Sequence, residues 1–520
     1  MLMFAILILS LLLALVAYFV PRGIRAYAMG SSALVLLLIL VYSVLRFAHH
    51  YTGGQLSVTT FALAPSIGIY FTIGVNGFTD ALLILSAIII FFSVLITDPR
   101  KFDRTMYALI LTTEVGLIGL LISRNFLFFY IFWEVVLVPV FFIILRYGGQ
   151  RHDSISLKFF VYTHIGSIFM LLSILTLYNF YFIYKGVYTF QMSLLLNPTF
   201  ISTHVPPFWR GFMLFGFLLS FLVKLPSFPL HSWLPDAYET APYPGTVILA
   251  GALSLMGGFG LFGILLPIAQ VFPAPLLGFL IFLGIVSLVY FSLVAMMQRN
   301  LKRMMAYASA GAMGFVTISF AAGILENGYD MNLELAGGMF QIVAHGLIMA
   351  AVFTSLYYIS EFTGHERIPS LGGLYREAPL ASSMLLAALM ASLGLPGFAG
   401  FIGEFSIVVA SFQVISWAIM LVIFAMIVTA SYHVWAAQRA LYGPYNENLG
   451  QIRDLGKGEF AITLSIMVVV FILGVYPNLI FPLFTHYVGS LSLAFMPLVQ
   501  HTSGLGLKAA SLILGRPGSI

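Results

Sequence analysis

The chain has 520 residues, of which 61% are hydrophobic and only 8% are charged, and its formal net charge is +5. A soluble domain averages about a quarter charged residues, so this composition excludes a globule in water and indicates an integral membrane protein. Because cysteine is absent, the chain cannot hold thiolate-ligated iron–sulfur clusters, disulfides or Cys-ligated zinc. The sequence also has no glycine-rich phosphate loop, and its small positive charge gives no nucleic-acid-binding patch.

Apolar runs long enough to cross a bilayer follow one another from end to end. They predict an all-α integral membrane protein with about fourteen transmembrane helices in a single polytopic domain, residues 1–520. The expected spans are, in chain order, 3–20, 27–45, 81–97, 105–121, 126–145, 158–180, 211–234, 246–267, 274–297, 301–322, 335–359, 379–409, 415–442 and 460–476. The polar stretches near 184–210 and 360–378 are expected to be loops.

Lysines and arginines gather in alternate loops of this series. With the N-terminus placed outside, most of them fall in the inner loops, as the positive-inside rule requires, and both chain ends lie outside. The first run, 3–20, lacks a basic segment before it, so it is expected to be a retained helix rather than a cleaved signal. The sequence thus predicts a multi-pass protein of a cell membrane, inner or plasma, with both termini on the outer side.

Glu134 lies in the middle of the span 126–145, among aromatic side chains. A charge at the centre of such a helix costs roughly 2.5–3.5 kcal/mol on insertion scales, so it usually faces a partner or a wet cavity. Pro139 is expected to open the backbone nearby, because it has no amide hydrogen and clashes with the carbonyl of Val135. Glu134 is therefore a candidate proton carrier, with a structural ion pair to another helix as the alternative.

Two further spans combine an interruption with a charge. Lys224 is followed by Pro226 and Pro229, and Glu404 follows Pro396 and a series of glycines. Broken helices are tolerated in a membrane only inside protein or beside water, and a pair of them in the two halves of a chain is typical of transporters built from inverted repeats. Both residues are candidate proton-exchanging groups. For Lys224 the alternative is a side chain that reaches the membrane surface.

Histidines and further charges complete the set of candidates. His345, between the two interrupted spans, could relay protons because imidazole titrates near neutrality, or could only hydrogen-bond across helices. Asp236 and Glu239 follow the first interruption, where they could instead stabilise the N-terminus of the next helix. The remaining auxiliary candidates are Glu114, His164, His231 and Lys302. Since no metal-ligating or nucleophile–base constellation appears, no metal site, cofactor site or separate enzyme site is expected in this chain.

These candidates lie in motifs that resemble the antiporter-like subunits of respiratory complex I. That family includes Mrp-type sodium/proton antiporter subunits and the ion-pumping subunits of membrane-bound hydrogenases. The resemblance runs from about residue 80 to residue 445. The motifs that carry it are Phe132–Pro139, Val223–Pro226, His231–Ala237, Ile248–Gly251, Leu301–Ser309, Ala344–Gly346 and Leu395–Phe405.

The resemblance implies two inverted five-helix repeats, helices 4–8 and 9–13, within the fourteen helices, and broken helices 7 and 12. Residues 105–267 would form the input half-channel for protons, and residues 274–442 the output half-channel. It further implies that Glu134 and Lys224 form a charge pair, that His345 belongs to a central relay, and that Glu404 exchanges protons at the end of the path.

Glutamate at position 404 and the short tail after residue 482 favour the M-type, or chain 4, subunit of this family. The implied function is that of a proton-translocating subunit of a complex I-like quinone oxidoreductase, with no redox centre in this chain. Quinone, flavin and iron–sulfur clusters are then expected in partner subunits. Those partners would be neighbouring antiporter-like membrane subunits and a redox peripheral arm.

Two positions depart from the M-type pattern. Leu255 stands where relatives usually have lysine, and Ala312 where they often have histidine; neither side chain can carry a proton. The central path would then depend on water and on side chains such as His345, Ser254, Ser309 or Tyr307. The alternatives are an Mrp-type antiporter subunit, a hydrogenase ion-pumping subunit and a non-pumping structural subunit.

Overall fold

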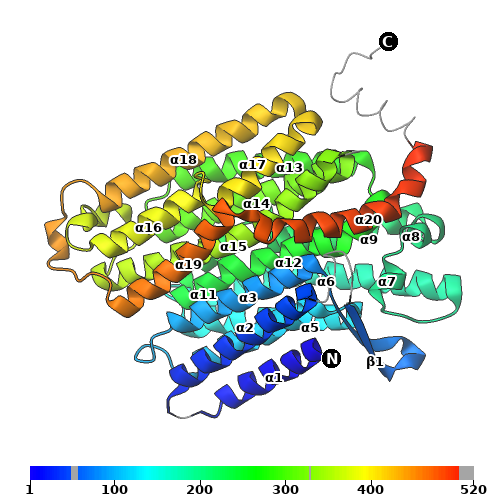
Figure 1. The fold of residues 1–520 in the computed structure, drawn as a ribbon, viewed down its shortest axis with the longest axis horizontal. Helices are drawn as coiled ribbons and strands as arrows, with labels where there is room; N and C mark the ends of the chain where they lie inside the picture. The colour runs from blue at the N-terminus through cyan, green and yellow to red at the C-terminus, as the bar shows by residue number, and fades with distance from the viewer. Residues whose placement is uncertain (21, 49–56, 327–328, 503–520) are drawn as a thin grey trace.

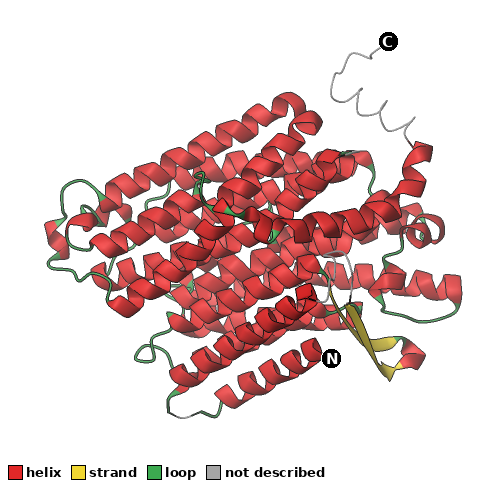
Figure 2. Ribbon diagram, viewed as in Figure 1, coloured by secondary structure: helices red, strands yellow, loops and turns green. Residues whose placement is uncertain are grey.

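The computed structural model describes residues 1–20, 22–48, 57–326 and 329–502. In these ranges the chain is a bundle of long helices that run roughly side by side (Figure 1), and helix is nearly all of its regular structure (Figure 2). Helices α1 (Leu2–Ala17) and α2 (Ile24–Ala48) lie at one edge of the bundle in this view, and α18 (Ile419–Leu441) lies at the opposite edge. The predicted all-α membrane fold is confirmed.

The remaining helices mostly follow the predicted spans, with ends that differ by a few residues, although the last of them, Phe481–Thr502, lies beyond the final predicted span, 460–476. They are α3 (Gly77–Leu95), α4 (Arg104–Ile122), α5 (Phe126–Tyr147), α6 (His152–Lys185), α7 (Met192–Leu195), α8 (Pro198–His204), α9 (Pro207–Lys224), α10 (Leu234–Thr240), α11 (Tyr243–Ile248), α12 (Ser254–Phe259), α13 (Ala274–Met296), α14 (Leu301–Leu325), α15 (Tyr329–Thr363), α16 (Pro379–Ser392), α17 (Ala399–Ile415), α19 (Lys457–Val475) and α20 (Phe481–Thr502). Short π-helical and 3-10 segments join α11 and α12 into one run, Tyr243–Val271.

Twelve of the described helices or continuous helical runs are long and apolar enough to cross a membrane. One of these runs, Ala399–Leu441, contains both α17 and α18, which a turn at Ser416 separates. Helices α1 and α16 have 16 and 14 residues, fewer than the roughly 20 that span a bilayer. The chain is thus a multi-pass membrane protein, and the count of fourteen spans stays a prediction.

The centre of the bundle is formed by α15 and by the run Tyr243–Val271. In the most apolar stretch of α15, 100% of the residues are buried, and in that of the run Tyr243–Val271 94% are. The corresponding share of buried residues is 33% in both α2 and α19. Polar side chains on the two central spans therefore face protein on every side, which is the setting that a path through the middle of the chain needs.

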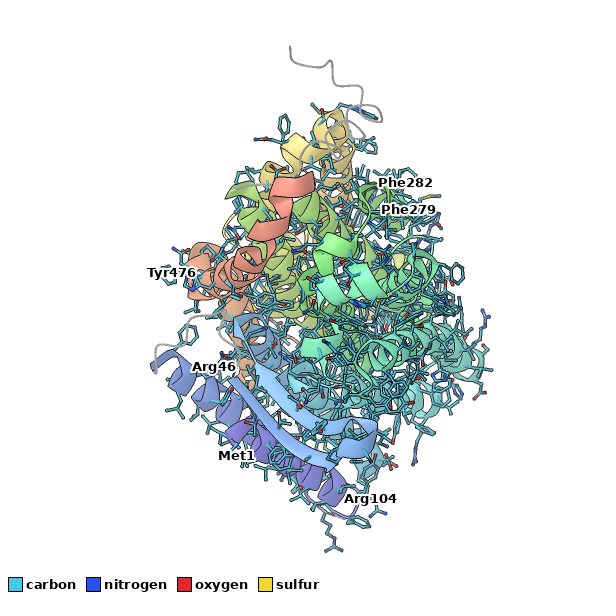
Figure 3. All side chains as sticks on the ribbon, turned by 90° about the vertical axis from the view of Figure 1, so that its right-hand side faces the viewer. Met1, Arg46, Arg104, Phe279, Phe282 and Tyr476 are labelled. Carbon is cyan, nitrogen blue, oxygen red and sulfur yellow. The ribbon has the colours of Figure 1, made fainter. Side chains whose placement is uncertain are left out.

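Strands β1 (Ser57–Ala64) and β2 (Ile69–Val75) form an antiparallel hairpin that the pattern of apolar runs did not predict. Phe61 pairs with Phe71 across the hairpin, and Phe4 of α1 packs on Phe61 with ring centroids 4.6 Å apart. The hairpin thus lies against the first helix, at the end of the molecule where Figure 3 labels Met1 and Arg46.

The expected loop at 184–210 is wrong in part, because α7 and α8 form within it. The local chemistry explains α8: Asn197 accepts a hydrogen bond from the amide of Phe200, and Pro198 occupies the first turn. An asparagine cap followed by proline is a favourable helix start.

Both predicted interruptions are present. Helix α9 ends at Lys224, and helix resumes only at Leu234, the start of α10. Likewise α16 ends at Ser392, and α17 begins at Ala399. Prolines in each gap cannot continue a helix, because they lack the amide hydrogen and clash with the preceding turn. Helix α5, by contrast, continues through Pro139, so the missing hydrogen bond there does not end it.

Candidate functional site

Glu134 of α5 and His164 of α6 face each other. The carboxylate Oε2 of Glu134 lies 3.2 Å from Nδ1 of His164, and the imidazole stacks on Phe160 one turn earlier. The two side chains are 21% and 37% exposed, so the pair lies at the outer surface of this chain, within reach of a neighbouring molecule. His164, an auxiliary candidate in the sequence, is therefore the direct contact of Glu134.

Lys224 is the last residue of α9, and only 1% of its surface is exposed. Its Nζ has no hydrogen-bond partner among the described residues, and the ring of Phe159 lies 5.7 Å from it. Glu134 is the charge that acts on this ammonium group. The two residues do not form a direct ion pair among the described contacts, since Glu134 contacts His164, so their coupling acts through space.

The chain after Lys224 is held in place by two other helices. The amide of Phe228 donates to Oγ of Ser287 on α13 at 2.9 Å, and Oγ of Ser227 lies 3.4 Å from Oγ1 of Thr317 on α14. The amide of Phe228, inside the break, is thus satisfied within the protein, as a broken helix at membrane depth requires of its backbone groups.

A cluster of charged residues fastens α10 to its neighbours. Asp236 accepts hydrogen bonds from Lys158 of α6 at 2.7 Å and from Arg303 of α14 at 3.0 Å, and Glu239 accepts one from Arg303 at 2.7 Å. Burial would raise the pKa of Asp236, but hydrogen bonds and charge from Lys158 and Arg303 outweigh it and hold the pKa below its usual value. The carboxylate therefore stays charged at neutral pH, and Asp236 acts as a structural anchor for α10.

The remaining auxiliary candidates beside α10 have structural contacts. Lys302 donates a hydrogen bond to the carbonyl oxygen of Ala241 at 2.5 Å, and its Nζ lies 4.3 Å from the centroid of the Tyr243 ring. His231 is half-buried, and its ring packs on Phe291 at 4.6 Å. The structure brings neither residue into contact with Lys224 or Glu134 among the described interactions.

A line of hydroxyl groups leads to His345 in the centre of the bundle. The hydroxyl of Tyr238 on α10 lies 3.4 Å from Oγ of Ser309 on α14, and Ser309 lies 3.1 Å from Nε2 of His345 on α15. The hydroxyl of Ser254 adjoins Tyr238. Of the hydroxyls that the sequence suggested, Ser254 and Ser309 are in this line, whereas Tyr307 packs against Phe291 instead.

Glu404 lies in the second turn of α17, beside the gap after α16. It is 7% exposed, and the side chain of Gln341 of α15 adjoins its carboxyl group. Gly394, in the gap, has a φ of +80°, and a Cβ there would lie 2.5 Å from Oε2 of Glu404. Position 394 therefore requires glycine, and the backbone of the gap packs directly against the carboxyl group of Glu404.

His433 of α18 is buried beside the same gap. Its Nδ1 lies 2.8 Å from the carbonyl oxygen of Thr429, and its Nε2 lies 3.1 Å from Oγ of Ser392, the last residue of α16. Because a carbonyl only accepts, Nδ1 carries the proton, and Nε2 accepts from the serine. This histidine fastens α18 to the end of α16.

Sequence reasoning missed Tyr238, Gln341 and His433. A histidine inside the span 415–442 was a signal for His433. Tyrosine and glutamine occur in membrane helices for many reasons, so Tyr238 and Gln341 gave no comparable signal. The candidate Glu114 is buried in α4, and its Oε1 has no hydrogen-bond partner among the described residues.

Comparison with known proteins gives consistent matches. Residues 123–429 match the family described as NADH:quinone oxidoreductase/Mrp antiporter, TM. The chain is 36% identical over 478 residues to F420H2 dehydrogenase subunit M of Methanosarcina mazei, covering 91% of this chain and 94% of that protein. It is 30% identical over 441 residues to NADH-quinone oxidoreductase subunit M of Rickettsia conorii, covering 84% and 86%. A chain of respiratory complex I from Thermus thermophilus, solved with bound NADH, superposes with a TM-score of 0.82 at 27% identity and covers 94% of this chain and all of that one.

Proposed function

Because the chain belongs to the NADH:quinone oxidoreductase/Mrp antiporter membrane family, we propose that it is a proton-translocating subunit of a respiratory complex I-like quinone oxidoreductase. The relatives at 36% and 30% identity are both M subunits, which confirms the M-type resemblance. One observation carries the proposal: each of the two helix interruptions holds a buried ionisable side chain, Lys224 at the first and Glu404 at the second.

In this proposal the proton path has an input half and an output half. Residues 105–267 contain Glu134 and Lys224 and form the input half, and residues 274–442 contain His345 and Glu404 and form the output half. The arrangement of the helices supports such a division, because five helical spans make up each part and the fourth of each is interrupted. Inverted repeats with paired broken helices are the usual architecture of ion-coupled transporters.

The exposed pair of Glu134 and His164 is the natural place for a neighbouring subunit to act. Two unit charges about 4 Å apart interact by about 4 kcal/mol at an effective dielectric of about 20. A charge that appears or moves beside this pair therefore changes the electrostatic attraction between the carboxylate of Glu134 and the ammonium group of Lys224. In this way electron transfer elsewhere in the complex supplies the energy. The proton then moves from Lys224 toward the centre of the chain.

The partners in this proposal are other antiporter-like membrane subunits and a redox peripheral arm. Quinone, flavin and iron–sulfur clusters belong to those partner subunits, and the chain contributes to the oxidoreductase without a redox centre of its own. The complex lies in the cell membrane, inner or plasma, with both termini of this chain on the outer side.

The test is the number of protons moved per electron in inside-out membrane vesicles that contain the complex. The donor is NADH or reduced F420, whichever the vesicles oxidise. Glu134→Gln is expected to leave the complex assembled and to lower the proton-to-electron ratio, because the amide keeps the shape of the side chain and removes its charge. Glu377→Gln, at a carboxyl group outside the helices that lies 3.3 Å from Arg376, is the matched control. An unchanged ratio in Glu134→Gln would contradict the proposal.

Two alternatives rest on specific observations. Leu255 and Ala312, at central positions where neither side chain can carry a proton, favour a structural subunit that no longer pumps. The family description, which also names the Mrp antiporter, favours sodium/proton exchange without electron transfer. The structural alternative predicts unchanged ratios for every substitution along the path, and the antiporter predicts proton movement driven by a sodium gradient alone.

A further inference from the structure

The centre of the proposed path lacks ionisable side chains at two of its positions. Leu255 is fully buried on α12, and Ala312 lies on α14, between the two interrupted helices in the chain. A proton that leaves Lys224 for Glu404 must therefore cross this region on other groups. The buried polar side chains around these two positions include several hydroxyls and His345.

Tyr238, Ser309 and His345 form a connected line across three elements. Their exposed fractions are 0%, 0% and 3%, so bulk water does not compete for their hydrogen bonds. The contacts of 3.4 Å and 3.1 Å join α10, α14 and α15 in turn. The ring of Tyr238 is fixed against Phe353 of α15, with centroids 5.7 Å apart, which keeps its hydroxyl aimed at α14.

We propose that the hydroxyl groups of Tyr238 and Ser309 carry protons through the centre of the chain to His345. This inference rests on the proposed function. In one step the hydroxyl of Ser309 gives its proton to Nε2 of His345 and accepts a proton from the hydroxyl of Tyr238. Tyr238 then receives a proton from the direction of Lys224. One O–H bond breaks and one forms at each hydroxyl, so the positive charge moves to the imidazole and both hydroxyls keep their composition. Each hydroxyl then rotates before the next proton passes.

The charged cluster on α10 lies beside this line. Asp236 and Glu239 flank Tyr238, and both bind Arg303, which lies on α14 with Ser309. The contact between Tyr238 and Ser309, at 3.4 Å, is longer than an ordinary O–H···O hydrogen bond of about 2.7–2.8 Å. A small approach of α10 to α14 closes it. Arg303 joins α10 to α14 beside this contact.

The experiment uses the intact complex in inside-out vesicles and measures protons moved per electron. Tyr238→Phe removes only the hydroxyl and keeps the contact with Phe353, and Ser309→Ala removes the second hydroxyl. Ser309→Thr keeps a hydroxyl at the same place. Ser292→Ala is the matched control, because among the described residues the hydroxyl of this buried serine bonds only to the backbone of its own helix. Assembly of each variant is followed on a native gel.

Tyr238→Phe and Ser309→Ala are expected to lower the ratio as far as Glu404→Gln does, whereas Ser309→Thr and Ser292→Ala keep the wild-type ratio. Wild-type ratios in both hydroxyl-deleted variants, together with a loss in Glu404→Gln, would overturn this relay and leave the proposed function standing. A wild-type ratio in Glu404→Gln would overturn both the relay and the proposed function. If Tyr238→Phe does not assemble, the difference between Ser309→Ala and Ser309→Thr decides, because equal ratios in those two variants contradict the relay.

Discussion

Lys224 and Lys302 are both buried lysines, with 1% and 3% of their surface exposed, yet their ammonium groups have opposite surroundings. Nζ of Lys224 has no hydrogen-bond partner among the described residues. Lys302 binds the carbonyl oxygen of Ala241, just beyond the end of α10. A buried charge without partners costs stability, whereas a lysine that satisfies buried carbonyls contributes to it. In the proposed mechanism Lys224 therefore serves proton transfer, whereas Lys302 serves structure.

This contrast predicts opposite results for the same substitution. Lys224→Met is expected to leave the thermal stability of the solubilised complex unchanged or higher and to abolish proton transport by this subunit. Lys302→Met is expected to lower stability by about 1–3 kcal/mol, because a buried carbonyl loses its donor. Thermal unfolding in detergent, followed for both variants side by side, checks this. A larger loss of stability in Lys224→Met than in Lys302→Met would contradict the assignment.

At the residue scale the sequence located the charges inside the apolar spans and could not predict what they touch. Glu134, Lys224 and Glu404 stand out because charges are rare in apolar spans. The contact between Glu134 and His164 depends on the rotation of α5 and α6 about their axes, which a single sequence does not fix. Tyr238 and Gln341 became visible only when α10 and α15 were placed beside their neighbours.

At the scale of elements, the gap after α9 depends on close packing by α12. A Cβ on Gly257 would lie 2.8 Å from the amide nitrogen of Leu225 and 2.8 Å from the carbonyl oxygen of Phe221. Both of these are backbone atoms, one in the last turn of α9 and one in the residue that follows Lys224, so they cannot move aside as a flexible side chain could. The absence of a side chain at Gly257 lets the central helix support the interruption directly.

Gly257→Ala is therefore expected to destabilise the protein by about 1–3 kcal/mol, the usual cost of overpacking a buried site. Gly278→Ala on α13 is the matched control, because a Cβ at that position meets nothing within 4 Å. In the control, alanine is expected to leave stability unchanged or to raise it slightly, since alanine is the better helix former. Equal melting temperatures for the two variants would show that α12 does not support the gap.

The helices and their interruptions were predictable, whereas the small elements between them were not. Long apolar runs and prolines are strong signals, and they located α9, α16 and the gaps that follow them. The hairpin Ser57–Val75 has no apolar run of membrane length, and it is fixed by contacts such as that of Phe61 with Phe4 of α1. Helices α7 and α8 are short, and α8 begins at a local asparagine cap, which a search for spans does not detect.

At the scale of the whole molecule, the chain presents several apolar surfaces that must be covered by lipid or by other proteins. Figure 3 shows Phe279 and Phe282 of α13 on the outside of the bundle, where they are 54% and 59% exposed. The pair Glu134 and His164 is likewise open to the outside of this chain. Both features fit one member of a larger membrane assembly whose energy source lies in another subunit.

The most direct test is to isolate the complex from its native membrane in mild detergent, reconstitute it in vesicles and follow acidification. We expect the chain to be recovered with iron–sulfur and quinone-site subunits. Acidification should begin only when the electron donor is added, and a protonophore should collapse it. Recovery without any redox subunit, with proton movement driven by a sodium gradient in the absence of a donor, would contradict the account and assign the chain to an antiporter.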